Sequence, residues 1–435
     1  MIKFSNLTTV SALIVILSAF ALPQNLIRAD ASRMESRIKE LSKFGLNAKG
    51  GSDRVAFSDH DRQGREYIIE LMKTAGLDVR IDFAGNIIGR RKGKSDSLPP
   101  MMFGSHIDTV PNGGAYDGCV GVIGAIEVIE LLNANRIETM HPLEVIVFAD
   151  EEGGLTGSRA LVGALGPEAL KVRSHSGKTI GEGIGFIGGD PERLSEVVRK
   201  QGDIAAFIEL HIEQGGILEG ASTDIGVVEG IVGIEWWEVT IEGFANHAGT
   251  TPMKGRRDAV LAGSRFALMV NEVVNSFGGA QVGTVGKFIA EPGAPNVIPG
   301  KVTLSLELRD LSEEMILRMY SAIEKRAIEI ASDTNTEISF RHLDVSAEPA
   351  LTDEKIKSAI ESSAKDLGLS SRRMPSGAGH DAQDLAKIAP TGMIFVPSRG
   401  GISHTPAEFT SAEDMANGAA VLLRTVLAID QGFSG

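Results

Sequence analysis

The stretch Leu143-Glu-Val-Ile-Val-Phe-Ala-Asp150-Glu-Glu152 decides the fold class of this chain. Its first seven residues are mostly apolar, which predicts a buried strand, and three acids follow at once. Met101–Ser105, Ala205–Leu210 and Gly392–Val396 have the same character, and the first two of these strands lead directly into His106 and His211. Runs that are apolar on both faces are typical of parallel sheets covered by helices on each side. The sequence therefore predicts an α/β fold with a mostly parallel central sheet.

Helical patterns separate these strands. Apolar residues recur at helical spacing from Ser32 to Leu77, over Gly118–Asn133 and over Glu413–Ile429. The Gly-rich stretch Gly181–Asp190 resembles a phosphate loop, but no strand precedes it and no Lys-Ser/Thr pair follows it. We therefore expect a plain loop there.

The middle of the chain has a different pattern. A strand with alternating polarity (Glu235–Glu242) precedes a helix, two strands, a second helix and a last strand, which predicts a small antiparallel α+β unit. The remaining expected elements are the helices Arg257–Phe277 and Glu313–Asp333 and the strands Gln281–Ile289, Lys301–Leu308 and Glu337–Leu343. Candidate site residues lie on both sides of this unit. We therefore predict a discontinuous catalytic domain (32–230 and 347–435) with an inserted lid or dimerisation domain (231–346).

Composition and the N-terminus restrict the class of protein. The chain has 435 residues and a net charge of −14, which argues against a nucleic-acid partner. Lys3, the apolar run Val10–Leu22 and the A-x-A-like triplet Ala29-Asp-Ala31 predict a signal peptide over residues 1–31 and export to a periplasm or the cell exterior. A buried N-terminal helix and an uncleaved anchor remain the alternatives. After cleavage, no stable membrane association is expected.

Chemically useful side chains gather where the predicted strands end. His106 and Asp108 share a strand face, so one can bind a metal while the other orients the imidazole. Glu151 and Glu152 are adjacent and diverge, so one can ligate a metal while the other moves a proton. Asp117, His211 and His404 complete the set. Three imidazoles and two carboxylates that converge would hold two divalent metals, with one carboxylate left as a base.

Eight motifs in a fixed order carry a resemblance to a known family. The chain resembles the M20-type metallohydrolases, and in particular their hydantoinase/carbamoylase branch, over nearly all of residues 32–430. The combination of HIEQG with HAGTTPM separates this branch from the M20 peptidases. The motifs are GSHIDTV (104–110), YDGCVGV (116–122), ELHIEQG (209–215), HAGTTPM (247–253), PNVIPG (295–300), ELRD (307–310), SGAGHDA (376–382) and GISHTPAE (401–408).

The resemblance implies a role for each matching residue. Glu151 would be the general base and later the acid, Asp108 would support His106, and His247 from a partner subunit's lid would stabilise the oxyanion, which implies a homodimer. The implied ligands of two divalent cations, Zn²⁺ or Mn²⁺, are His106, Asp117 (bridging), Glu152, His211 and His404. The implied substrate contacts are Gln214, His247, Asn296 and Arg309.

The expected reaction is hydrolysis of a linear C–N bond by a metal-activated water. The branch acts on N-carbamoyl amino acids and related ureido acids such as allantoate, and Arg309 suits a substrate carboxylate. The segment after Glu152 is shorter than is usual in the family and lacks an Arg-Phe pair, and Tyr116 replaces the common Phe. The alternatives are an exported M20-like aminoacylase or dipeptidase and a non-catalytic binding protein on the same fold.

Overall fold

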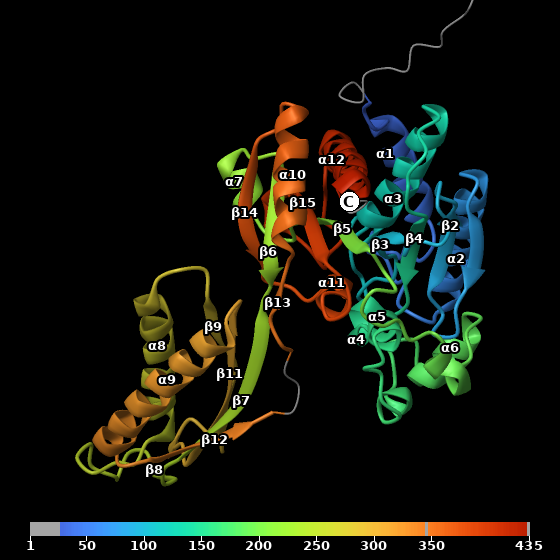
Figure 1. Ribbon diagram of the computed structural model, residues 1–435. Coiled ribbons are helices and arrows are strands. Elements are labelled where there is room, and N and C mark those ends of the chain that lie inside the picture. The colour runs from blue at the N-terminus through green and yellow to red at the C-terminus, as the bar shows by residue number, and fades with distance from the viewer. Residues whose placement is uncertain (1–26, 344–346, 433–435) are drawn as a thin grey trace, which may run out of the picture.

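The computed structural model describes residues 27–343 and 347–432. The chain forms a large unit built on a nine-stranded sheet and a smaller unit built on a four-stranded sheet, which lies to one side of the large unit (Figure 1).

The large sheet has the strand order β1-β2-β4-β3-β5-β15-β6-β13, and β14 also pairs with β6. Its centre, β4-β3-β5-β15, is parallel, whereas β1, β2 and β13 pair antiparallel at the edges. The fold-class prediction of a mostly parallel central sheet is therefore confirmed. The strands are β1 (Asp78–Ile81), β2 (Ile87–Arg91), β3 (Met101–His106), β4 (Leu143–Phe148), β5 (Ala206–Ile212), β6 (Ile225–Ile231), β13 (Ala350–Leu351), β14 (Ser371–Ser376) and β15 (Thr391–Val396).

Helices cover both faces of this sheet, and successive strand residues enter different cores. On β4, Val145 and Val147 belong to the core that also holds residues of α1, α3, α10 and α12, whereas Ile146 and Phe148 belong to the core that holds residues of α5, α7 and α11. This double burial explains the unbroken apolar runs in the sequence. The helices of this unit are α1 (Ala31–Leu41), α2 (Asp59–Thr74), α3 (Cys119–Ala134), α4 (Glu151–Gly154), α5 (Thr156–Leu161), α6 (Ile180–Phe186), α7 (Ile217–Ala221), α10 (Glu354–Asp366), α11 (Asp381–Leu385) and α12 (Ala412–Gly432), with short 3₁₀ turns at η2 (Ala169–Lys171), η3 (Pro191–Glu196) and η4 (Arg399–Gly401).

Two local predictions are wrong. The helical pattern from Ser32 to Leu77 is interrupted between α1 and α2, where Asn47 accepts loop hydrogen bonds and Ser52 pairs with Gly113. Turn residues in this segment outweigh the apolar spacing around them. The expected plain loop Gly181–Asp190 contains α6, because Thr179 and Glu182 form a reciprocal capping box that satisfies the first N–H groups of that helix.

The smaller unit is an antiparallel sheet of order β12-β7-β11-β9 with α8 and α9 packed on one face. We call it the lid. The chain enters the lid from β6 through Val232 and returns beside the same point, where Ile234 and Ala347 form a bridge. Its elements are β7 (Gly233–Glu242), β8 (Asn246–His247), α8 (Ala259–Phe277), β9 (Val282–Glu291), β10 (Val297–Ile298), β11 (Lys301–Asp310), α9 (Glu313–Thr334) and β12 (Glu337–His342).

The predicted signal segment lies largely outside the described residues. Within residues 27–343 and 347–432, no helix combines the length and the apolar character needed to cross a bilayer.

Candidate metal centre

The candidate metal ligands lie at the carboxyl ends of the four central parallel strands. His106 ends β3, Glu151 and Glu152 open α4 just after β4, and His211 lies near the end of β5. His404 follows β15 through the η4 turn. The carboxyl edge of such a sheet is where α/β folds collect functional groups, because every loop there starts from a fixed strand end.

Asp117 lies at the centre of this arrangement, with three imidazoles around its carboxylate. One carboxylate oxygen, Oδ1, is 3.6 Å from Nε2 of His106 and 3.1 Å from Nε2 of His211. The other oxygen, Oδ2, is 3.2 Å from Nε2 of His404, which is itself 3.5 Å from Oε2 of Glu152. The carboxylate thus belongs to two groups of potential metal ligands, His106–Asp117–His211 and Asp117–Glu152–His404.

Backbone carbonyls orient two of the imidazoles. Nδ1 of His106 lies 3.1 Å from the backbone oxygen of Asp108, and Nδ1 of His211 lies 2.9 Å from that of Ile212. A carbonyl only accepts, so Nδ1 donates in each ring, and Nε2, which faces Asp117, is the nitrogen that offers a lone pair to a metal when the ring is neutral. This is the tautomer that a metal-binding histidine needs.

Gly118 makes the close approach of these groups possible. It adopts a φ of +63° directly before α3, and a Cβ at this position would lie 2.4 Å from Nε2 of His106. Its N–H donates to Nε2 of His211 at 3.1 Å. Glycine allows both the left-handed backbone and the packing of the ring against it.

Asp108 acts on Glu151 and Glu152 more directly than on His106. Its carboxylate accepts the N–H groups of Glu151 (3.3 Å) and Glu152 (3.1 Å) and so fixes the start of α4. The same carboxylate is 3.7 Å from Nδ1 of His106, which bonds instead to the Asp108 backbone. The expected support of His106 therefore comes from the main chain of Asp108.

Burial and crowded charges shift the pKa values at this centre. Burial raises the pKa of Glu151 well above its usual value, and the neighbouring carboxylates of Asp381, Glu152 and Asp117 add to this. Burial and Asp117 raise the pKa of Glu152 to about 7. The pKa of Asp117 falls well below its usual value, since hydrogen bonds from three imidazoles outweigh its burial. Such strongly perturbed groups in one cleft are typical of a functional site.

Gln214 lies beside the second ligand group. Its backbone has a positive φ of 58°, and its Nε2 donates to Oδ2 of Asp117 at 2.7 Å. The side chain of His404 next to it is 48% exposed, so the centre opens to solvent on this side.

The structure does not bring all predicted substrate contacts to the centre. His247 and Asn296 lie next to each other on the β8–β10 ribbon, and both are exposed. Strand β8 lies at the far end of the lid, away from α4 (Figure 1). Arg309 lies on β11, where it forms a fork with Glu307 and donates to the backbone oxygen of Gly377 at 2.6 Å. It therefore links the lid to the large unit.

The centre contains further residues that the sequence analysis did not identify as site residues. The His380 ring lies edge-on to the His211 ring at 4.5 Å, and Glu209, His211 and His380 form a third group of potential ligands. Asp381 is buried and both of its carboxylate oxygens lack a hydrogen-bond partner within the described residues. The motif SGAGHDA contains both residues and is the signal that could have identified them.

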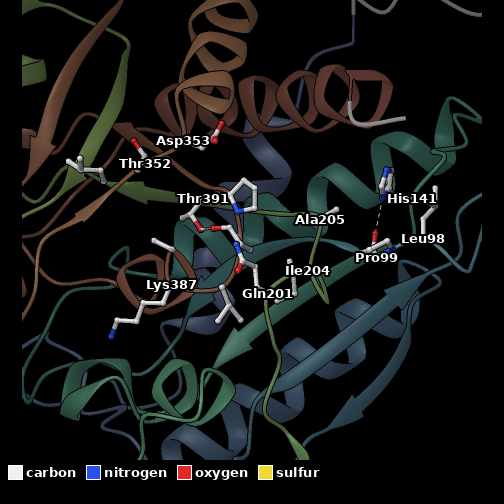
Figure 2. Close-up of a pocket in the computed structure, with 16 residues that line it drawn as sticks. Leu98, Pro99, His141, Gln201, Ile204, Ala205, Thr352, Asp353, Lys387 and Thr391 are labelled. Atoms are coloured by element: carbon white, nitrogen blue, oxygen red, sulfur yellow. Dashed lines mark hydrogen bonds between the residues drawn. The ribbon is translucent and has the colours of Figure 1, made fainter. Parts of the chain in front are cut away.

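A separate cavity lies at the opposite ends of the strands. This cavity of about 610 Å³ is lined at the amino ends of β3, β5 and β15, by Pro99, Ala205 and Thr391 among others (Figure 2). Among the described residues that line it, no cluster of metal-ligating side chains occurs. The groups of potential metal ligands among the described residues lie instead at the carboxyl edge of the sheet.

Comparison with known proteins agrees with this geometry. A family model described as peptidase family M20/M25/M40 matches residues 102–428. An N-carbamoyl-L-amino acid amidohydrolase of Geobacillus stearothermophilus is 42% identical over 405 residues, which cover 92% of this chain and 98% of that protein. A ureidoglycolate hydrolase of Arabidopsis thaliana is 39% identical over 412 residues, which cover 92% of this chain and 87% of that protein.

A solved structure is also similar over most of the chain. It is an amidase of the hydantoinase/carbamoylase family from Burkholderia multivorans, with a TM-score of 0.87, 37% identity, and coverage of 93% of this chain and 98% of that one. This chain therefore belongs to peptidase family M20/M25/M40, in its hydantoinase/carbamoylase branch.

Proposed function

We propose that this chain is a two-metal amidohydrolase that cleaves a linear C–N bond of an N-carbamoyl amino acid or a related ureido acid such as allantoate. The observation that carries the proposal is the carboxylate of Asp117, whose two oxygens face two different groups of ligand-type side chains. A carboxylate in that position can bridge two cations. The relatives named above act on ureido compounds, which supports the same substrate class.

The donor atoms fit divalent cations that accept nitrogen and oxygen ligands. Each of the two groups offers three such atoms, all within 4.8 Å of one another. Imidazole nitrogens and carboxylate oxygens suit Zn²⁺, and Mn²⁺ also accepts this mixture. Burial raises the pKa values of Glu151 and Glu152, which means that their negative charge lacks compensation; cations would supply it.

The protein side of the reaction follows from these positions. When bound, the cations would polarise the substrate carbonyl and make a water molecule more acidic. Glu151 opens α4 with Oε2 3.6 Å from Nε2 of His106, so it can accept a proton from water held at this centre. It would then return that proton to the leaving nitrogen. For a carbamoyl substrate the products would be an amino acid, ammonia and carbon dioxide.

Substrate recognition would combine Gln214, which lies beside the centre, with residues of the lid. The guanidinium of Arg309 can bind a substrate carboxylate through two parallel hydrogen bonds if it exchanges Glu307 for the substrate. Gln214 and Asn296 would bind polar groups of the ureido acid, and His247 would donate to the oxyanion. Domain closure would be required, because His247 and Asn296 lie at the tip of the lid.

We infer that the functional form is a homodimer in which the partner lends His247. Two features of the lid support this inference. His247 is exposed on the lid tip, and the lid also exposes apolar side chains on α8 (Leu261 and Leu268) and on the edge strand β9 (Phe288 and Ile289). Exposed apolar groups around an unpaired edge strand favour association with another surface.

We also propose that the chain is exported, with a leader that ends before Ile27. Ile27 is buried, Arg28 donates to the Leu367 backbone oxygen at 2.8 Å, and Asp30 caps α1. A cut after Ala31, as expected from the sequence, would remove these contacts, and Ala19-Phe-Ala21 offers an earlier A-x-A-like site. N-terminal sequencing of the protein recovered separately from the cytoplasm and from the exported fraction of its host decides. An unprocessed chain found only in the cytoplasm contradicts export, and a mature chain that starts at Ser32 contradicts this position.

A substrate panel tests the proposed activity against its alternatives. The protein, supplied with Zn²⁺ or Mn²⁺, is incubated with N-carbamoyl-L-amino acids, allantoate, ureidoglycolate, N-acyl amino acids and dipeptides. We expect ammonia release from one or more ureido acids and no comparable cleavage of the acyl and peptide substrates. Preferential cleavage of dipeptides or N-acyl amino acids would favour an aminoacylase or dipeptidase. Saturable binding without turnover by metal-loaded protein would favour a binding protein.

A further inference from the structure

Glu408 is a buried carboxylate that joins two loops of the metal centre. Its exposed fraction is only 4%. Oε1 accepts the N–H groups of Tyr116 (2.9 Å) and Asp117 (3.0 Å). Oε2 accepts the hydroxyl of Ser403 (2.7 Å) and the N–H of His404 (3.3 Å). All four partners are donors, and each carboxylate oxygen is used by one loop.

These two loops carry two of the three residues in the Asp117–Glu152–His404 group. Asp117 lies 291 positions before Glu408 in the sequence, so the chain itself sets no distance between the loops. His106 and His211, by contrast, lie on the paired strands β3 and β5. The separation of Asp117 from His404 therefore depends on a side-chain tie, whereas the separation of His106 from His211 is set by the paired strands.

The backbone around the tie is arranged for it. His404 has a positive φ of 57°, which is unfavourable for a residue with a side chain, and its N–H is held by Glu408. On the other loop, a Cβ on Gly114 would lie 2.1 Å from Oε1 of Glu408. The absence of a side chain at Gly114 thus leaves the space that the carboxylate occupies.

The four donors require a carboxylate and not merely a polar group of the same shape. A glutamine offers one acceptor oxygen and one NH₂ group. In one orientation the NH₂ faces the N–H groups of Tyr116 and Asp117, and in the other it faces that of His404. In either orientation, two hydrogen-bond donors face each other in the buried interior, so the hydrogen bonds between residue 408 and one of the two loops are weakened.

We propose that Glu408 is a positioning residue that sets the separation of Asp117 and His404 and thereby the affinity of the second cation site. This inference rests on the proposed two-metal function. It assigns to Glu408 no contact with substrate; the residue acts through Asp117 and His404. Partners that orient metal ligands in this way typically change metal affinity by about 10–100-fold when they are removed.

The test is metal binding by the full-length Glu408→Gln variant, measured without reference to activity. Purified protein is stripped, titrated with Zn²⁺ against a competing chelator, and its metal content is determined by mass spectrometry after desalting. We expect the wild type to hold two ions per chain and Glu408→Gln to hold one tightly, with the second about 10–100-fold weaker. Excess metal should restore turnover to the variant, which a loss of folded protein would not allow.

Asp430→Asn is the matched control. Asp430 is also 4% exposed and accepts two backbone N–H groups, from Met140 (2.8 Å) and His141 (2.9 Å), at the other end of the sheet. The Asp430→Asn substitution should lower thermal stability at least as much as Glu408→Gln and leave the affinities of both metal sites unchanged. Ser403→Ala removes the hydroxyl bond to Glu408 and also the 3.2 Å contact of that hydroxyl with Oδ2 of Asp117. It provides a milder variant should Glu408→Gln fail to fold, and should weaken the second ion several-fold.

The outcomes are distinct. The inference would be overturned, and the proposed function left intact, if the Glu408→Gln variant bound two ions with wild-type affinity. If that variant does not fold, the same result with Ser403→Ala would overturn the inference. An equal loss of metal in Asp430→Asn would also overturn it, because the effect would then be general destabilisation. A wild-type protein that binds no divalent metal would instead contradict the proposed function.

Discussion

At the scale of single residues, Asp117 and Glu151 have opposite electrostatic settings within one small volume. Three imidazoles lower the pKa of Asp117 well below its usual value, and burial with nearby carboxylates raises that of Glu151. An ionised carboxylate that could bridge two cations and a neighbouring carboxylate that could accept a proton are the two groups that metal-assisted hydrolysis needs. The sequence pattern predicted which residues converge. It did not predict these pKa shifts, because the shifts arise from burial among side chains that are distant in the sequence.

Glu151→Gln tests the proton-transfer role. The amide keeps the size of the side chain but cannot accept the proton of water, so kcat should fall by about 10²–10⁴-fold. Metal content, measured by mass spectrometry on the same preparation, should stay at two ions per chain, since Glu151 is not among the expected ligands. Turnover near the wild-type rate would contradict the role of Glu151, and loss of metal would reassign it as a ligand.

Arg309→Lys tests carboxylate recognition. Lysine keeps the charge but loses the planar fork that allows two parallel hydrogen bonds. A charged hydrogen bond contributes about 1.5–3 kcal/mol, so kcat/KM should fall by about 10–100-fold, mainly through KM. Steady-state kinetics on the best substrate of the panel provide the measurement. An equal effect on a substrate analogue whose carboxylate is replaced by an amide would show that Arg309 does not bind that group.

At the scale of elements, the ends of strands and the starts of helices decide the geometry of the site. Buried strands were predictable because their apolar runs are long and end at charged groups, as at Phe148 and Asp150. The break between α1 and α2 and the existence of α6 were not, because side-chain oxygens of Asn47 and Thr179 accept short-range hydrogen bonds from the backbone. These bonds outweigh the apolar spacing at the first place and the glycine-rich composition at the second. The same limit applies to Glu408 and His380, whose partners come from loops that are distant in the sequence.

Gly118→Ala tests the entry into α3. A Cβ at Gly118 would lie 2.4–2.6 Å from the His106 ring, in a backbone conformation with φ of +63°. We expect a loss of about 1–3 kcal/mol in the free energy of unfolding and weaker metal binding, because the ring must move. Denaturant unfolding and metal titration measure the two effects.

Gly185→Ala on α6 is the control for that substitution. No atom lies within 4 Å of a Cβ there, so the change should be neutral or slightly stabilising, as alanine is in helices. Metal binding by Gly118→Ala equal to that of Gly185→Ala would show that the packing of His106 against Gly118 has no role in the site.

At the scale of the whole molecule, the lid and the metal centre have to be brought together. The carboxyl edge of the large sheet holds the candidate ligands and Glu151. His247 lies on β8, at the far end of the lid (Figure 1), and Asn296 directly precedes its partner strand β10. The sequence predicted that the candidate ligands gather at this edge, and the structure brings them together there as groups that could hold a metal. It could not place the lid residues, because their position relative to the centre depends on domain and subunit arrangement.

Complementation between subunits tests the lent His247. Glu151→Gln and His247→Ala chains, each inactive alone, are unfolded and refolded together at equal concentration. If His247 acts on the partner's centre, half of the dimers are mixed and each has one complete site, which predicts about a quarter of wild-type activity. Activity that stays at the level of the separate variants, in a mixture shown to contain mixed dimers, would mean that each chain uses its own His247.

The proposed bridge between two cations at Asp117 can be seen by anomalous diffraction from crystals grown with Zn²⁺. Two anomalous peaks per chain are expected, one on each side of the Asp117 carboxylate: one contacted by His106 and His211, the other by Glu152 and His404. A single peak, or peaks that these five side chains do not contact, would contradict it.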